Sequence, residues 1–397
     1  MSGHLRFGSF MPPYHSPLNN HALAIERDLE TVELLDRLGY DDVWFGEHHS
    51  GGYECSPMPE LMIAAAAQRT RRIRLGTGVI SLPYHHPLMV ADRMVFLDHM
   101  TRGRCIFGVG PGALVADSQM MGIDYGDLRP RMEESLEAIL ELLTSPEPVT
   151  RKAEWFELRD AQLHVRSHTR PMVPIAVAGA VSPTGPKLAG RHGLSLLSFG
   201  AASTVGFNKL AGTWEIVEAE AAASGARVER EDWALVGYMH VAETERQARD
   251  EVRYQIRSFF DYHHTVAPPL LADVETMTHD ELIDGINASG AGIVGTPEMA
   301  VAHLQKLVDR TGGFGTFLIS SVDWANREAT RRSLELLARE VIPHFDGSIP
   351  ARAAAFARAK ARQVADGRLR DAGREKATAA YNVAATATGQ PDRGTVS

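Results

Sequence analysis

The feature that most constrains the fold is a regular alternation of short apolar runs, rich in β-branched residues, with amphipathic segments of helical length. Eight runs are expected to form strands, at residues 6–11, 42–46, 73–81, 104–109, 173–178, 194–198, 234–241 and 316–320. Helices are expected at residues 22–38, 59–69, 87–99, 128–143, 207–223, 244–260, 297–309 and 327–341. Eight strand–helix units predict a closed α/β TIM barrel, (β/α)8, and an open doubly wound sheet is the second option.

Three segments depart from this rhythm. Residues 155–165 alternate like a strand pair and predict a hairpin insertion. Residues 263–295 are too long for an ordinary connection, and we interpret them as a mobile lid over the active site. After residue 345 an Ala/Arg-rich helix is expected at 350–364, followed by a polar tail. The sequence therefore predicts one barrel domain, residues 1–345, and a C-terminal extension, residues 346–397.

The bulk composition narrows the class of function. The 397 residues are 44% hydrophobic and carry a net charge of -9, so they form a globular protein without the concentrated basic surface that nucleic-acid binding requires. No apolar run approaches the roughly 20 residues that cross a bilayer. Two cysteines without a CxxC spacing predict neither a disulfide framework nor a thiolate zinc site. We expect a cytoplasmic protein that acts on a diffusible small molecule.

Ionisable residues follow the second expected strand as Glu47-His48-His49. Catalytic groups of such barrels gather at the carboxyl ends of the strands, and one histidine suffices for acid–base catalysis near neutral pH. A metal site is the weaker interpretation because neighbouring strand residues point to opposite faces, so we predict no metal. A pair of hydrogen-bonded structural histidines remains an alternative.

Glycines mark two further strand ends. Gly76 and Gly78 in the third strand indicate a close approach of backbone, compatible with a flat ligand or with plain barrel packing. Gly110 lies in a Gly-rich stretch after the fourth strand, but Pro111 and a loop follow where a dinucleotide-binding motif requires a helix. We interpret this stretch as a loop beside a cofactor.

Ser182 and Gly185 follow the fifth strand, at the expected start of a helix. Free amides and the positive end of the helix dipole make such a position suitable for a phosphate group. The alternative is that Ser182 is only an N-cap, with Pro183 at the first helical position.

In their order along the chain, these motifs resemble the bacterial luciferase-like family of flavin-dependent monooxygenases. The likeness runs from residue 5 to about residue 345, and its narrower features resemble the limonene 1,2-monooxygenase-type subgroup. It is carried mainly by Glu47-His48-His49-Ser50-Gly51-Gly52, Leu75-Gly76-Thr77-Gly78-Val79 and Tyr84-His85-His86-Pro87.

The resemblance implies a two-component monooxygenase. Reduced FMN would come from a separate NAD(P)H-dependent flavin reductase, and one atom of molecular oxygen would enter a small apolar organic substrate, with a terpene-like molecule as one candidate. The family position of the catalytic histidine falls on His48, and a non-proline cis peptide is expected at Gly78–Val79. The cofactor-binding residues implied are Thr77, Gly78, Val79, Gly110, Ser182 and Gly185. FAD or a deazaflavin is the alternative cofactor.

One departure from the family concerns the phosphate, because Pro111 stands where bacterial luciferase has an arginine. Either Ser182 and backbone amides hold the phosphate, or Lys187 or Arg191 supplies the charge. The residues expected to line the substrate pocket are Tyr14, His15, Tyr53, Cys55, Phe199 and Met239.

Three other functions compete with the monooxygenase. A deazaflavin-dependent oxidoreductase on the same barrel would transfer hydride without oxygen. The remaining two are a flavin-binding protein without turnover and a metal-dependent barrel hydrolase, which the absence of paired histidines in the first strand disfavours. The family resemblance also leads us to expect a homodimer.

Overall fold

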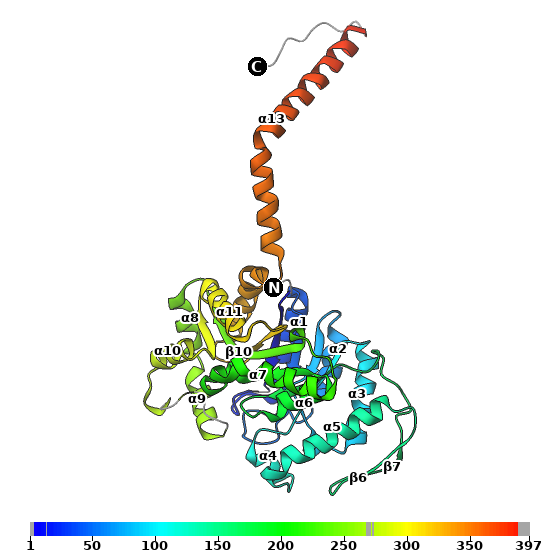
Figure 1. Ribbon diagram of the computed structural model, residues 1–397. Coiled ribbons are helices and arrows are strands. Elements are labelled where there is room, and N and C mark those ends of the chain that lie inside the picture. Colours follow the sequence, from blue (N-terminus) through cyan, green and yellow to red (C-terminus); the bar gives the residue numbers. More distant parts are fainter. Residues whose placement is uncertain (1–3, 13, 267–270, 272–273, 388–397) are drawn as a thin grey trace. The chain divides into compact units, whose positions relative to one another are not determined.

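The computed structural model describes residues 4–12, 14–266, 271 and 274–387 (Figure 1). The chain divides into two compact units, Met1–Phe345 and Asp346–Ser397. The first unit contains the barrel, and the second contains one long helix.

Within the described residues, eight parallel strands form the closed barrel that the sequence predicts. In barrel order they are β1 (Arg6–Met11), β2 (Asp42–Phe45), β3 (Arg74–Thr77), β5 (Cys105–Gly110), β8 (Ile175–Gly179), β9 (Ser195–Ser198), β10 (Trp233–Val241) and β12 (Thr316–Ser320). The barrel closes where β1 pairs with β12, from Arg6 opposite Thr316 to Phe10 opposite Ser320. Two short strands extend it: β4 (Ile80–Ser81) pairs with β5, and β11 (Gly292–Gly295) pairs with β10.

Helices surround this barrel (Figure 1). They are α1 (His21–Leu38), α2 (Pro59–Arg69), α3 (Pro87–Thr101), α4 (Val115–Met120), α5 (Leu128–Thr144), α6 (Thr184–His192), α7 (Thr204–Ser224), α8 (Glu245–Val252), α9 (Ile256–Thr265), α10 (His279–Ser289), α11 (Pro297–Thr311) and α12 (Arg327–Leu336). The single helix expected at 244–260 is broken into α8 and α9, because the Gln255 amide donates instead to the Trp324 carbonyl, 3.0 Å away.

The side chains of the barrel strands alternate between two apolar layers, as the period of two in a strand requires. Along β10, Ala234 and Val236 belong to the cluster that fills the barrel interior, which also contains Phe10. Trp233 and Leu235 belong to the larger cluster between barrel and helices. The strand ends above the interior cluster therefore form the rim on which a site can be built.

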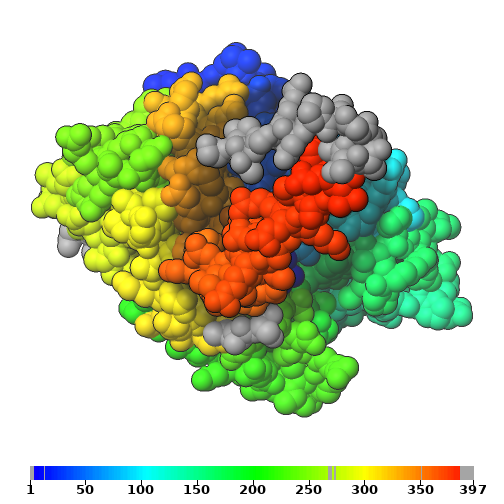
Figure 2. Space-filling view, turned by 90° about the horizontal axis from the view of Figure 1, so that it is seen from above, coloured from blue at the N-terminus to red at the C-terminus, as the bar shows by residue number. Residues whose placement is uncertain are grey.

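The two insertions differ from their predictions. The hairpin consists of β6 (Val149–Lys152) and β7 (Glu157–Ala161), so it starts earlier than residue 155. With α5 it projects from one side of the barrel unit, in teal to green in Figures 1 and 2. Residues 263–295 contain α10 and β11, neither of which the sequence analysis identified. A capping box between Thr278 and Glu281 starts α10, and Gly290 ends it with φ 78°.

The second unit contains α13 (Ser348–Ala387), a helix of 40 residues. The prediction that the helix ends at 364 is wrong because small and polar residues were taken as a tail, although alanine, arginine and lysine have high helix propensity. The last ten residues, 388–397, lie outside the described part of the chain. Among the described helices, none is long and apolar enough to cross a membrane.

Candidate active site at the carboxyl end of the barrel

His48 lies in the loop that follows β2 and is held between two carboxylates. Its Nδ1 atom is 3.0 Å from Oδ2 of Asp117, and its Nε2 atom is 3.7 Å from Oε2 of Glu54. The imidazole keeps 18% of its surface exposed, whereas the Asp117 and Glu54 side chains keep 2% and 8%. The histidine is therefore the accessible member of a largely buried group.

Asp117, in α4, fixes the loop as well as the histidine. Its Oδ1 atom accepts hydrogen bonds from the His49 amide at 3.1 Å and the Ser50 hydroxyl at 2.5 Å. Burial raises the pKa of Asp117, but the hydrogen bonds from His48 and Ser50 outweigh it and leave the pKa below its usual value. Asp117 is therefore a carboxylate near neutral pH.

These negative charges determine the protonation of His48. Burial lowers the pKa of the imidazole, but the charge of Glu54 and the hydrogen bond to Asp117 more than compensate, with a smaller contribution from Glu47. The pKa of His48 is therefore raised above its usual value. A protonated imidazole with an accessible face can act as a general acid.

Glu47 points away from this pair and organises a second group of side chains. Its Oε1 atom is 3.1 Å from Nε2 of both His49 and His85, and its Oε2 atom accepts the Ser81 amide at 3.0 Å. The hydrogen bond to Glu47 also raises the pKa of His49. His49 thus has the structural role that the sequence left open for both histidines. Among the described residues, no three or more His, Cys, Asp or Glu side chains are arranged to hold a metal ion.

Tyr14 and Tyr53, both expected in the substrate pocket, lie in an aromatic cluster beside Glu54. Their rings stack with centroids 5.1 Å apart, and both also contact the ring of Tyr262. The hydroxyl of Tyr262 donates to Oε2 of Glu54 at 2.7 Å. Cys55, in the same loop, is exposed as a whole. Partial burial of its thiol group, and then the charge of Glu54, raise the pKa of the thiol.

Val79 and Phe199 form an apolar surface at the top of the barrel interior. Both are half-buried against the interior cluster, and the ring of Phe199 meets that of Phe10 edge-on at 5.0 Å. The Gly78–Val79 peptide bond is cis, as expected. A Cβ atom on Gly110 would lie 2.5 Å from Cγ2 of Val79, so glycine is required there.

Two other residues expected to bind cofactor, Thr77 and Gly185, also have a structural role in the barrel. Thr77 is fully buried, and its hydroxyl donates to the Gly108 carbonyl at 2.7 Å and accepts the Gly108 amide at 2.9 Å. A Cβ atom on Gly185 would lie 2.1 Å from the Ala178 carbonyl oxygen. Thr77 and Gly185 therefore fix backbone positions, and the Thr77 hydroxyl is already engaged within the sheet.

Ser182 precedes α6 with its hydroxyl 3.0 Å from that of Thr184, and both side chains are half-buried. The Thr184 amide lies 3.3 Å from the Ser182 hydroxyl, so this serine also contributes to the turn into the helix. Lys187 and Arg191 face carboxylates instead of this turn: Lys187 is 3.7 Å from Glu220, and Arg191 pairs with Glu133. Because the Thr184 and Lys187 amides are bonded and Pro186 has no N–H, the Ser182 hydroxyl and the Gly185 amide are the candidate donors to a phosphate here.

Met239 and His15, both expected in the substrate pocket, have packing partners of their own. Met239 packs in the cluster between barrel and helices, while its neighbour Tyr238 joins the aromatic cluster. His15 is buried with Nε2 2.8 Å from Asp28, beside a cavity of about 280 Å³ between α1 and the segment after β12. Met239 follows the regular alternation of β10, in which Ala234 and Val236 face the interior while Trp233, Leu235 and Met239 face the helices.

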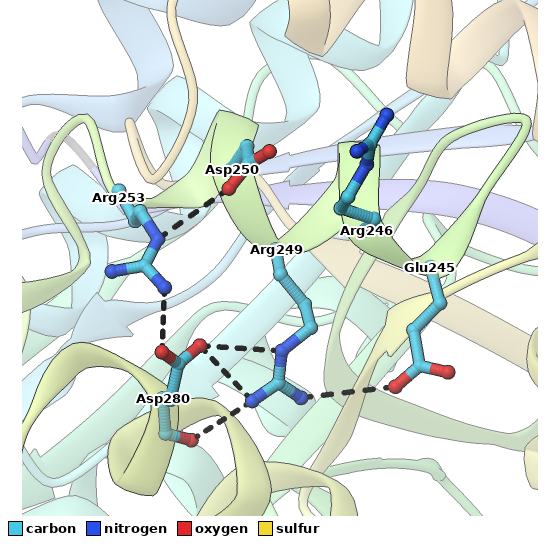
Figure 3. Close-up of a pocket in the computed structure, with 6 residues that line it drawn as sticks. All are labelled: Glu245, Arg246, Arg249, Asp250, Arg253 and Asp280. Carbon is cyan, nitrogen blue, oxygen red and sulfur yellow. Dashed lines mark hydrogen bonds and ion pairs between the residues drawn. The ribbon is translucent and has the colours of Figure 1, made fainter.

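A separate groove of about 330 Å³ lies between α8 and α10 (Figure 3). Arg249 reaches Asp280 at 3.1 Å, and Arg253 reaches the same carboxylate at 2.6 Å. Figure 3 shows Arg246 pointing away from these pairs. Mutual charge neutralisation identifies the groove as an ion-pair contact between two helices.

Asp117, Glu54, Tyr262 and His85 are site residues that the sequence analysis missed. Asp117 is 69 residues from His48, and Tyr262 is 208 residues from Glu54. Contacts between residues so far apart along the chain cannot be predicted from the spacing of residues within one motif. The available signal was that Glu54 and Asp117 lie in the segments that follow the ends of β2 and β5, Asp117 in the short helix α4.

Comparisons with known proteins identify the family and support the fold. The family model described as luciferase-like monooxygenase matches residues 5–313. Limonene 1,2-monooxygenase from Rhodococcus erythropolis is 50% identical over 347 residues, covering 87% of this chain and 88% of that protein. 4-Hydroxyprotoasukamycin monooxygenase from Streptomyces nodosus subsp. asukaensis is 44% identical, covering 87% and 93%. The FMN complex of the oxygenating constituent of 3,6-diketocamphane monooxygenase from Pseudomonas putida superposes with a TM-score of 0.71, at 25% identity and covering 86% and 98%. The chain belongs to the luciferase-like monooxygenase family.

Proposed function

We propose that this monooxygenase is the oxygenase component of a two-component system. It would take reduced FMN from a separate NAD(P)H-dependent reductase and use molecular oxygen to oxygenate a small apolar organic substrate. Limonene is the first compound to assay because a relative 50% identical to this chain is named for it. A homodimer is the assembly that we propose with it.

The observation that carries this proposal is His48 at the mouth of the barrel. Its imidazole is accessible, and its protonated form is stabilised by Asp117 at 3.0 Å and by the charge of Glu54. An oxygenase needs a proton donor where negative charge develops on oxygen, in a site from which water is excluded. Half-buried Tyr53, stacked on the buried Tyr14, adds an aromatic ring beside Glu54.

The residues at the mouth fit a flavin. Half-buried Val79 and Phe199 offer an apolar surface for a flat ring system. The Ser182 hydroxyl and the Gly185 amide at the start of α6 offer hydrogen-bond donors for a phosphate. When bound, reduced FMN supplies the two electrons with which one oxygen atom becomes water while the other enters the substrate.

The chain's own residues position the His48 ring and provide the proton for the reacting oxygen atom. Asp117 accepts the Nδ1–H of His48, so the ring orientation is fixed and the Nε2–H is directed away from that carboxylate. The Nε2 atom is 3.7 Å from Glu54, beyond a normal hydrogen bond, so its proton is available to a reacting oxygen atom. Glu47 holds the adjacent His49 and His85 and so keeps the loop in place.

The test is an anaerobic titration with reduced FMN, followed by mixing with ¹⁸O₂ and limonene. Saturable binding and one ¹⁸O atom in the product are expected. If reduced FMN does not bind while a reduced deazaflavin does, the hydride-transferring function replaces this proposal. If reduced FMN binds but no substrate of a terpenoid panel acquires ¹⁸O, the substrate class is wrong.

A further inference from the structure

Two side chains approach the Oε2 atom of Glu54, those of Tyr262 and His48, but only Tyr262 is hydrogen-bonded to it. The Tyr262 hydroxyl donates to Oε2 at 2.7 Å, a short and strong hydrogen bond to a carboxylate. Nε2 of His48 approaches the same atom only to 3.7 Å. The tyrosine therefore holds this carboxylate oxygen at a position that is beyond hydrogen-bond distance from Nε2 of His48.

We propose that Tyr262 is a positioning residue that holds Glu54 away from His48, so that the Nε2–H of His48 stays free for the reacting molecule. The role of His48 rests on the proposed function above. The competition for Glu54 does not depend on it, because it is a property of the protein without cofactor.

The surroundings of Tyr262 are built to hold its hydroxyl in place. The residue is 3% exposed, and its ring packs against Tyr14 and Tyr53 at centroid distances of 5.4 and 5.2 Å. A Cβ atom on Gly51 would lie 2.8 Å from the Tyr262 hydroxyl, and Gly51 has φ +82°, so only glycine permits this approach. Burial and the charge of Glu54 raise the pKa of Tyr262, which keeps it a donor.

The backbone of Glu54 is also fixed, because Glu54 forms a β-bridge with Tyr14. Its carboxylate can therefore reach His48 by side-chain rotation alone once Tyr262 releases it. Tyr262 belongs to α9, which leads into residues 263–295, and α9 and α4 lie at the same end of the barrel unit in Figure 1. The position of α9 would thus determine whether the histidine proton is free.

The charged groups that face His48 are Asp117, Glu54 and, at longer range, Glu47, while His49 is its cationic neighbour. Asp117 is hydrogen-bonded to His48, and Glu47 is held by His49, His85 and the Ser81 amide, whereas the Glu54 carboxylate is held by the Tyr262 hydroxyl. Removing the Tyr262 hydroxyl is expected to bring the carboxylate into hydrogen-bond contact and raise the titration midpoint of His48. Removing the Glu54 charge is expected to lower it.

The experiment is an NMR titration of the full-length, cofactor-free protein, with the His48 signal identified by its loss in His48→Gln. Tyr262→Phe should move the midpoint upward, and Glu54→Gln should move it downward by about one pH unit. Tyr238→Phe is the matched control, because it removes another buried hydroxyl of the same aromatic cluster that makes no hydrogen bond to Glu54 among the described contacts.

A midpoint in Tyr262→Phe that is unchanged or lower overturns the proposal, as does an equal upward shift in Tyr238→Phe. In turnover assays, Tyr262→Phe should lower kcat more than it raises KM, and adding Glu54→Gln should recover part of that loss. No recovery in the double variant also contradicts the mechanism. Because the titration contains no flavin, failure of the proposed oxygenase function leaves its result interpretable.

Discussion

Asp117→Asn tests how much of the site depends on one buried carboxylate. The substitution keeps the size of the side chain and removes the charge that lies 3.0 Å from Nδ1 of His48. It also weakens the hydrogen bonds from the His49 amide and the Ser50 hydroxyl, since an amide has one acceptor oxygen instead of two.

The size of the effect follows from these contacts. An opposite charge at this distance changes a histidine pKa by about 1–3 pH units, which corresponds to about 1.4–4 kcal/mol at 1.36 kcal/mol for each unit. Asp117 raises the pKa of His48, so its loss lowers that pKa. If protonated His48 is required, activity falls as pH rises through its pKa, and the variant should lose activity at a pH lower by about 1–3 units.

The assay is product formation per oxygen consumed, measured from pH 5 to 9 with reduced FMN supplied in excess. Asp124→Asn is the control, because Asp124 caps only the short turn at Gly126. The loss of the charge-assisted bonds should also cost about 1.5–3 kcal/mol of folding stability. A pH profile identical to that of the unmodified protein, in a variant that is destabilised as expected, would refute the role of Asp117 in protonating His48.

Three further predictions follow from other contacts. His48→Ala should keep affinity for reduced FMN within a few-fold but divert oxygen consumption from product to hydrogen peroxide, measured by binding and coupling assays. Glu251→Gln should destabilise the fold at pH 7 by about 1–3 kcal/mol. Burial raises the pKa of Glu251, but its hydrogen bonds, first among them the one with His240, outweigh burial and lower the pKa from 4.5 to about 2. That stability is present above pH 4.5 and is lost as pH falls towards 2, so urea unfolding of the two proteins should converge there. Gly108→Ala should cost about 1–3 kcal/mol or more in thermal unfolding, because its Cβ would lie 1.9 Å from the Thr77 carbonyl oxygen.

Each of these has a clear contrary result. Full coupling in His48→Ala would remove the histidine from the mechanism. A stability difference for Glu251→Gln that stays constant from pH 7 to pH 3 would show that its charge contributes nothing. Gly225→Ala is a comparison for Gly108→Ala, because no atom lies within 4 Å of the added Cβ and only its φ of +74° opposes it. Equal losses in both would mean that crowding at Gly108 is not the cause.

The strand and helix pattern was largely predictable because it depends on local sequence. Buried parallel strands are nearly continuous apolar runs, and the bounds of seven of the eight were predicted within two residues. The third, predicted at 73–81, is divided into β3 (Arg74–Thr77) and β4 (Ile80–Ser81). The elements that were missed do not show the apolar pattern on which the prediction relied. Strand β11 is four residues long and is a strand only because β10 lies beside it, and α13 continues to Ala387 through small and polar residues.

Part of the candidate site could be proposed in the same way. His48 was singled out because ionisable residues end an apolar strand, and Ser182 because it precedes a helix; both roles stay predictions. Their environment was not identifiable, since Asp117 and Tyr262 come from segments far away along the chain. Thr77 was predicted as a cofactor ligand, but its hydroxyl bonds to the neighbouring strand, a contact that no spacing in the sequence reveals.

The sequence by itself therefore determined the number of strand–helix units and the chemical groups at their ends, because periodicity and residue type are local properties. Only the tertiary structure decided which carboxylate meets which histidine. Closing the barrel brings α4, α9 and the loop after β2 together. In the inference above, the free proton of His48 depends on two distances from Oε2 of Glu54, 2.7 Å to the Tyr262 hydroxyl and 3.7 Å to Nε2 of His48. Distances of that kind arise from packing between segments, which the order of residues does not record.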